Sequence, residues 1–199
     1  MTTVRLREGG TTVSPQWAAA GESSSDKALI RRIAAGDQSA MRALFARYWV
    51  TLYRWLLRLV DDATLADDLL SEVFLDVWRQ AASFEARSSV STWLLAIARY
   101  KALSARRRRT DAQLDEATVS AVSDIADDPE MTLQKKDRAE ALRESLPRLS
   151  PEHREVIDLA YYHGKSVKEI ADITGINEAT VKTRMFYARK KLAELAASA

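Results

Sequence analysis

Several side chains in the last quarter of the chain are spaced so that they could bind a polyanion. Between Glu178 and Arg189, polar and aromatic side chains alternate with apolar ones at the period of an α-helix. The outward-facing set consists of Glu178, Thr180, Lys182, Thr183, Arg184, Tyr187 and Arg189. Cations and hydrogen-bonding groups on the outside of a helix suit phosphates and base edges in the major groove of DNA. The alternative is an ordinary helical hairpin with a solvated basic face.

The residues that precede and interleave with this set predict how it is positioned. Ser166 can cap a helix, and Glu169 three positions later completes a capping box. Gly175 stands where a left-handed C-terminal cap is needed, and Asn177 can cap the next helix. Apolar positions at helical spacing then face inward, namely Val181, Met185, Ala188, Leu192 and Leu195. Two helices around a tight turn, the second of them basic, indicate a helix-turn-helix.

A second basic stretch lies near the middle of the chain. Its cations are Arg99, Lys101 and the run 106–109, and its aromatic residues are Phe84, Trp93 and Tyr100. Cationic grooves combined with aromatic stacking surfaces are what single-stranded nucleic acid requires. The alternative is that Trp93 belongs to the core and that the arginines are solvated or contact phosphate alone.

Carboxylates form a stripe on the helix predicted before this basic stretch. Asp68, Glu72 and Asp76 are four residues apart, which places them on one helix face. A metal-binding cluster is one reading, but no histidine lies nearby in the sequence. A solvated face is the ordinary reading, and a protein-docking face is the third.

The sequence predicts no enzyme, no metal site and no bound cofactor. His153 and His163 are the only histidines, and their ten-residue separation fits no common metal spacing. The six glycines are scattered, so no phosphate-binding loop is expected. No serine stands in a nucleophile elbow.

Composition and charge describe a globular chain with two basic segments. The 199 residues are 47% hydrophobic and 29% charged, include no cysteine, and contain no apolar run of membrane-spanning length. We therefore expect a cytoplasmic protein with no membrane insertion. Residues 26–109 carry 15 basic and nine acidic side chains, residues 110–137 two and eight, and residues 138–199 eleven and nine. Basic segments favour nucleic acid, although excesses this small also suit a solvated surface.

The apolar periodicity predicts an all-α fold, with two helical domains joined by a flexible acidic linker. Residues 1–25 are expected to form a flexible tail, 26–109 the first domain, 110–137 the linker and 138–199 the second domain. The second domain contains the helix-turn-helix.

Capping residues predict where the individual helices begin and end. In the first domain the expected helices are one capped by Ser25 and ended by Gly36, one from Asp37 to Asp61, one over residues 65–82, and one capped by Ser91 that ends in the arginine run. In the second domain they cover residues 133–146 and 151–163, before the helix-turn-helix. The four tryptophans of the first domain are expected to be mostly core.

The order of these motifs closely resembles that of the extracytoplasmic-function (ECF) sigma factors of bacteria. The resemblance rests on the acidic-aromatic helix 67–78, on Phe84 and the stretch 91–99, on the basic end, on the acidic linker, and on residues 149–157 before the helix-turn-helix. It covers residues 26–196. Each motif alone is moderately specific, whereas their order and spacing together are highly specific.

The resemblance implies a sigma factor that binds RNA polymerase core and directs promoter-specific transcription initiation, held in check by an anti-sigma factor. Docking on the clamp helices of the largest polymerase subunit would use Asp67, Asp68, Glu72, Phe74, Asp76 and Trp78. Reading and melting the −10 promoter element would use Phe84, Arg87, Ser91, Trp93, Arg99, Tyr100, Lys101, Arg106 and Arg107. The outward-facing set of residues 178–189 would read the −35 element of promoter DNA, and the second polymerase contact would be the flap of the second-largest subunit.

One departure from the family pattern and two alternative functions remain at this point. Many members have asparagine and aspartate where this chain has Tyr100 and Ser104, so the −10 preference is left open. A conventional helix-turn-helix regulator would bind operator DNA without core polymerase, usually as a dimer on a two-fold site. A structural interaction protein would use the acidic helix alone.

Overall fold

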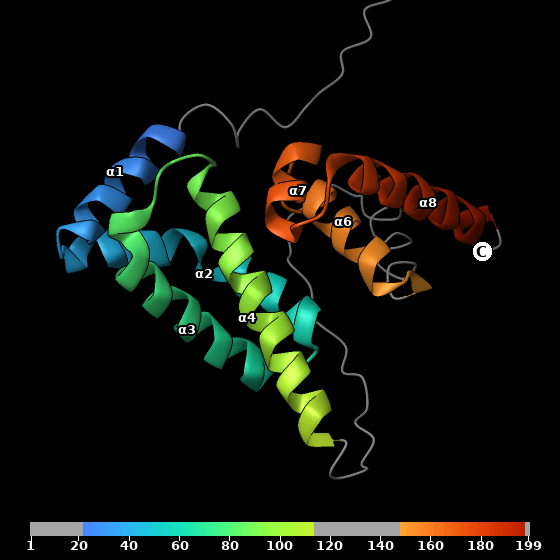
Figure 1. Ribbon diagram of the computed structural model, residues 1–199, viewed down its shortest axis with the longest axis horizontal. Coiled ribbons are helices and arrows are strands. Elements are labelled where there is room, and N and C mark those ends of the chain that lie inside the picture. Colours follow the sequence, from blue (N-terminus) through green and yellow to red (C-terminus); the bar gives the residue numbers. More distant parts are fainter. Residues whose placement is uncertain (1–21, 114–147, 198–199) are drawn as a thin grey trace, which may run out of the picture.

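The computed structural model describes residues 22–113 and 148–197, which form two groups of helices (Figure 1). The first group comprises α1 (Glu22–Ala34), α2 (Gln38–Val60), α3 (Ala63–Gln80), a short 3-10 turn (Ala81–Ser83) and α4 (Val90–Gln113). The second comprises α6 (Pro151–Tyr161), α7 (Val167–Thr174) and α8 (Glu178–Ala197). No strand occurs within these two ranges, which confirms the predicted all-α class.

The first group is built around α2, which packs against α1, α3 and α4. Leu44, Leu52 and Leu56 of α2 are fully buried, as is the large side chain of Trp55. The facing side of α4 is lined largely by alanine, with Ala98, Ala102 and Ala105 buried beside Leu94 and Leu95. Small side chains allow helices to approach closely, because the side chains at the contact set the distance between the axes.

Short polar residues define the turns of the first group. Asp37 caps α2 by accepting hydrogen bonds from the backbone amides of Ser39 and Ala40, as its sequence position predicts. Asp61 adopts a left-handed conformation that ends α2, and Asp62 accepts from the amide of Leu65 and so begins α3. The two aspartates therefore both end one helix and start the next.

Three details of the first group differ from the sequence predictions. Helix α1 begins at Glu22, so Ser25 lies inside the helix and does not cap it. The cap of α4 is Ser89, whose hydroxyl accepts from the amide of Thr92, and Ser91 falls in the first turn. Helix α4 continues past the arginine run to Gln113. The prediction that the four tryptophans are mostly core is confirmed, since Trp55 is fully buried and Trp78 and Trp93 pack against the core, while Trp49 is 43% exposed.

The helix-turn-helix forms as predicted. Ser166 and Glu169 make the reciprocal hydrogen bonds of a capping box at the start of α7. Gly175 ends α7 with φ +72°, a conformation that favours glycine. Asn177 then caps α8 by accepting from the amide of Thr180 at 2.7 Å. The inward side of α8 is buried at Val181, Met185 and Ala188.

The two groups share one hydrophobic core. The buried residues Val156, Leu159, Ile170 and Ile173 of the second group belong to the same cluster as the core of the first group. Helix α7 lies beside the N-terminal part of α4 (Figure 1). A separate, smaller cluster joins Leu149, Ile157 and Ala188 within the second group.

Some predictions fall outside the described residues. These are the flexible tail up to residue 21, the helix over 133–146 and most of the acidic linker. Within the described ranges, no helix combines the length and the apolar character that crossing a membrane requires.

Replacing Gly175 with valine is expected to lower the free energy of unfolding by about 1–2 kcal/mol, because a left-handed backbone is costly for residues with a Cβ. A Cβ here would have no heavy atom within 4 Å, so the cost lies in the backbone and not in collision. Gly175→Asn is the matched control, since asparagine tolerates this conformation. Urea unfolding followed by circular dichroism measures both. Equal losses in the two variants would contradict the explanation.

Candidate nucleic-acid interface

The outer face of α8 carries the set predicted to contact duplex DNA. Five of its members are exposed, namely Glu178, Lys182, Thr183, Tyr187 and Arg189. Thr180 and Arg184 are half-buried. The Thr183 hydroxyl donates to the carbonyl of Ala179 at 3.0 Å, which fixes its rotamer on the helix. The structure thus places the set on the sides of α8 that are not buried, from its first turn at Glu178 to Arg189 about three turns later.

Aromatic residues beside this face were not predicted to take part. Phe186 is 63% exposed, and its ring lies 5.4 Å from that of Tyr187 in an edge-on arrangement. The guanidinium of Arg189 lies 6.0 Å from the ring of Tyr161, which is exposed at the end of α6. The helical period was the available signal for Phe186, because it follows the inward Met185 by one position and so faces away from the core.

The set predicted to bind single-stranded DNA is divided on the structure. Tyr100 is 69% exposed, and Arg87, Arg106 and Arg107 are exposed as well. Phe84 and Trp93 are half-buried and pack together, with ring centroids 4.8 Å apart. Tyr100, Arg106 and Arg107 of α4 are therefore accessible to a ligand. The rings of Phe84 and Trp93 pack against each other and are only partly accessible.

Lys101 was predicted to contact DNA, but its side chain pairs with carboxylates of the protein itself. Its ammonium group lies 2.8 Å from the carboxylate of Asp76 and 3.1 Å from that of Glu72, both on α3. The hydrogen bond to Asp76 raises the pKa of Lys101, burial opposes this, and Glu72 adds to the increase. The lysine thus joins α4 to the carboxylate stripe, and its charge is already balanced within the protein.

Arg99 and Ser91 are engaged by the second group of helices. The guanidinium of Arg99 donates two hydrogen bonds to the carboxylate of Glu155 on α6, at 2.6 and 3.3 Å. The hydroxyl of Ser91 accepts from the ammonium group of Lys165 at 2.6 Å. The partners of both residues lie more than 50 positions away in the chain, so no local pattern could have predicted them.

The predicted docking face on α3 keeps its acidic edge. Asp67 and Asp68 are exposed, while Glu72 and Asp76 are partly occupied by Lys101. Phe74 is buried and Trp78 half-buried. Three exposed apolar side chains were not predicted to belong to this face. They are Leu75 on α3, and Phe45 and Trp49 on the neighbouring α2. The Phe45 ring packs on Phe74 with a centroid distance of 4.7 Å, so α2 extends this face.

Metal coordination is not a feature of the described residues. Within residues 22–113 and 148–197, no group of three or more histidine, cysteine, aspartate or glutamate side chains is placed to hold a metal ion. The carboxylates of the stripe are instead bridged by the ammonium group of Lys101.

Comparison with known proteins decides what these surfaces belong to. The Sigma-70 region 2 model matches residues 44–111, and the Sigma-70, region 4 model matches residues 139–192. The ECF RNA polymerase sigma factor SigL of Mycobacterium tuberculosis is 32% identical over 166 residues, which cover 83% of this chain and 93% of the relative. The chain belongs to the ECF RNA polymerase sigma factors. A second member, SigK of Mycobacterium bovis, is 30% identical over 176 residues, covering 85% of this chain and 92% of the relative.

Solved structures of two further proteins are similar to this ECF sigma factor. CnrH, in complex with the cytosolic domain of CnrY, has a TM-score of 0.63 and 25% identity over 87% of this chain and 98% of its own. The sigma factor RpoE of Bartonella quintana, in complex with the anti-sigma factor NepR, has a TM-score of 0.65 and 28% identity over 78% of this chain and 95% of its own. The ECF sigma factor described here is therefore a non-enzymatic transcription initiation factor.

Proposed function

We propose that this ECF sigma factor binds RNA polymerase core in the cytoplasm and contacts its promoters with two surfaces, α8 for the −35 element and α4 for the −10 element. The observation that carries the proposal is the outer face of α8. Its exposed Lys182 and Thr183 lie in the first two turns of α8, which follow the tight turn at Gly175. A recognition helix needs this placement, because its N-terminal residues contact base edges in the major groove.

The −10 surface rests on the exposed part of α4 and the loop before it. Tyr100 offers a ring for stacking, and Arg106 and Arg107 offer cations at the end of the same helix. Melting a promoter unstacks and flips bases, which costs a few kcal/mol per base and is offset by stacking and pocket contacts. Arg87 adds a further exposed cation on the loop.

Polymerase docking is assigned to α3, together with the part of α2 beside it. The exposed carboxylates Asp67 and Asp68 and the exposed apolar groups of Phe45 and Leu75 combine charge with hydrophobic area. Such a mixture is typical of interfaces that form and dissociate, with apolar anchors surrounded by polar groups. The proposed contacts are the clamp helices of the largest subunit for α3 and the flap of the second-largest subunit for the second group.

An anti-sigma factor is the proposed regulator. Support comes from the two similar structures, since RpoE was solved with the anti-sigma factor NepR and CnrH with the cytosolic domain of CnrY. The apolar side chains exposed on α2 and α3 offer area that such a partner would cover. An inhibitor bound there would compete with core polymerase for the same face.

Arg184→Ala is expected to reduce transcription from a promoter that depends on its −35 element about 5-fold or more, because a direct base contact is worth about 1–3 kcal/mol. Lys191→Ala is the matched control, since Lys191 lies about two turns further along α8 and pairs with Glu194 at 3.5 Å. Transcript yield with purified core polymerase measures both. Unchanged yield with Arg184→Ala would remove this residue from the reading surface.

The double variant Asp68→Arg with Glu72→Arg is expected to weaken core binding about tenfold, because reversed charges at an interface act against complementarity. Because Lys101 keeps Asp76 as a partner at 2.8 Å, α4 should stay attached to α3. Asp172→Arg, an exposed position on α7, controls for added positive charge. Titrating labelled protein with core measures the affinity. If the double variant binds as tightly as the wild type, α3 is not the docking face.

A further inference from the structure

A pocket of about 340 Å³ lies between α1 and the loop that joins the 3-10 turn to α4. One side is lined by α1, through Lys27, Ile30 and Arg31 at helical spacing. The other side is formed by the 3-10 turn and by Phe84 and Ala86 of the loop, which passes beside α1 in Figure 1. Ligand pockets in proteins begin at about 300 Å³, so the space suits a single large ring system.

The lining of the pocket suits an aromatic side chain. Ile30 and Ala81 of the lining are buried and supply an apolar surface. Lys27 and Arg31 add two cations, whereas the carboxylate of Glu85 is paired with an arginine of the same loop. An aromatic ring buries a large apolar area, and its face attracts cations. A tryptophan ring satisfies both requirements best.

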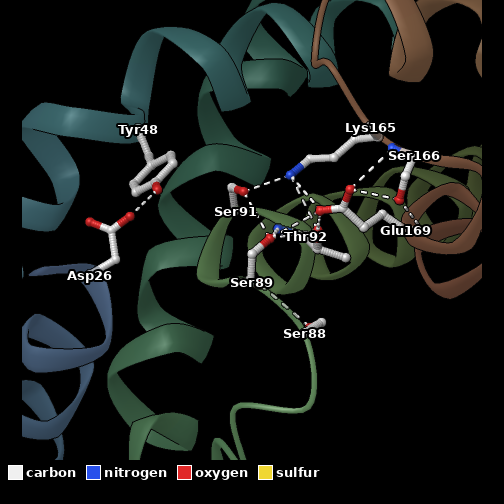
Figure 2. Close-up of polar contacts among 9 residues, drawn as sticks. All are labelled: Asp26, Tyr48, Ser88, Ser89, Ser91, Thr92, Lys165, Ser166 and Glu169. Atoms are coloured by element: carbon white, nitrogen blue, oxygen red, sulfur yellow. Dashed lines mark hydrogen bonds and ion pairs between the residues drawn. The ribbon is translucent and has the colours of Figure 1, made fainter. Parts of the chain in front are cut away.

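The α1 side of the pocket is fixed to the core of the first group. Figure 2 shows Asp26 of α1 directed at Tyr48 of α2. The Tyr48 hydroxyl donates to the buried carboxylate of Asp26, which also pairs with Arg47. Ile30 and Ile33 are buried one and two turns further along α1. This side therefore offers a preformed surface.

The loop side of the pocket is held only at its two ends. The amide of Phe84 donates into the 3-10 turn at 3.3 Å, and the hydroxyl of Ser88 donates to the carbonyl of Ser89 at 3.4 Å (Figure 2). Between them, residues 85–87 are exposed and make no backbone-to-backbone hydrogen bond within residues 22–113 and 148–197. Ala86 nevertheless has a φ of +55°. A left-handed conformation is costly for a residue with a Cβ and persists only where its surroundings hold it.

The segment before α1 contains a side chain of the right kind within reach. Trp17 is the only aromatic residue of residues 1–21, which lie outside the described ranges. It stands five positions before Glu22, where α1 begins, so the chain between them spans at most about 17 Å. Ile30 is eight positions into α1, which is about 12 Å along the axis. Gly21 directly precedes α1, and glycine allows the chain to reverse there.

We propose that the indole ring of Trp17 occupies the pocket between α1 and residues 84–86, and that it holds the loop in the shape that presents Arg87 to promoter DNA. The second half of the proposal rests on the proposed function, which places Arg87 on the −10 surface. Trp17 is then a positioning residue that acts through the loop and does not touch DNA. A segment of the same chain has an advantage over a separate partner, because a short connection gives it an effective concentration of about millimolar.

Quenching of a bimane label by tryptophan tests the docking in the full chain. The label is attached at Ala82→Cys, an exposed position in the lining, and the chain has no cysteine of its own. Replacing Trp17 with alanine should make this label about twofold brighter, because a ring docked in half of the molecules quenches half of the signal. The same label at Ala193→Cys, exposed on α8, is the matched control and should not change. Equal brightness at Ala82→Cys with and without Trp17 would overturn the proposal.

Two further measurements separate Trp17 of the same chain from other occupants. Ala34→Phe narrows the pocket from its α1 side and should brighten the label as Trp17→Ala does, whereas Ala35→Phe, exposed and outside the lining, should not. Unlabelled wild-type protein should leave the labelled Trp17→Ala variant bright. Dimming on mixing would mean that a second copy fills the pocket, and it would overturn the proposal.

Reconstituted transcription with core polymerase tests whether the docked ring holds the loop. Trp17→Ala should lower the transcript yield about threefold, because the loop is then in the binding shape in about one molecule in three. In a protein that already carries Arg87→Ala, the same change should have no further effect, since residues that act through one contact are not additive. Trp17→Phe, which keeps an aromatic ring, should restore most of the yield.

The outcomes distinguish the two halves of the proposal. If the label reports docking but Arg87→Ala alone leaves the yield unchanged, the assignment of Arg87 to the −10 surface fails while the docking stands. If Arg87→Ala lowers the yield and Trp17→Ala does not, the holding of the loop is overturned.

Discussion

Helix α4 has one side left after it packs into the first group, and part of that side contacts the second group. The proposed −10 contact uses the exposed part of the same side. Leu94, Ala98 and Ala102 are buried on the inward side of α4, which packs against α2 and α3. The outer side presents Tyr100 to solvent but gives Arg99 to Glu155 of α6. Tyr100, Arg106 and Arg107 stay exposed beside this contact, so the second group covers only part of the outer side of α4.

Internal partners decide which basic side chains are available to nucleic acid. Lys101 neutralises carboxylates of α3, Arg99 pairs with α6, and Arg109 lies 3.0 Å from Asp62. The exposed Arg106 and Arg107 remain accessible on the same helix. The basic segment is therefore divided between residues that pair within the protein and residues that are exposed to a ligand, and Lys101 joins α4 to α3.

Local signals predicted the fold better than they predicted the site. Capping at Asn177 and the left-handed turn at Gly175 depend on residues within three positions, so the sequence alone located the helix-turn-helix. The start of α4 was missed by two residues, since Ser89 and Ser91 are equally able to cap and only the fold selects Ser89. The partners of Lys101 and Arg99 lie 25 or more positions away in the chain. An ion pair at that separation produces no periodic pattern in the sequence from which it could be predicted. The exposed apolar groups of α2 were missed for a related reason, because helical period does not say how wide the buried face is.

Reconstituted transcription tests the central claim most directly. Purified core polymerase would be incubated with and without this protein on genomic fragments, and the transcript start sites would be mapped. The account predicts start sites that occur only with the protein and that follow a shared two-block promoter. If no such start sites occur and core is not bound, while the protein alone protects a palindromic duplex, the chain acts as a conventional helix-turn-helix regulator and the account is wrong.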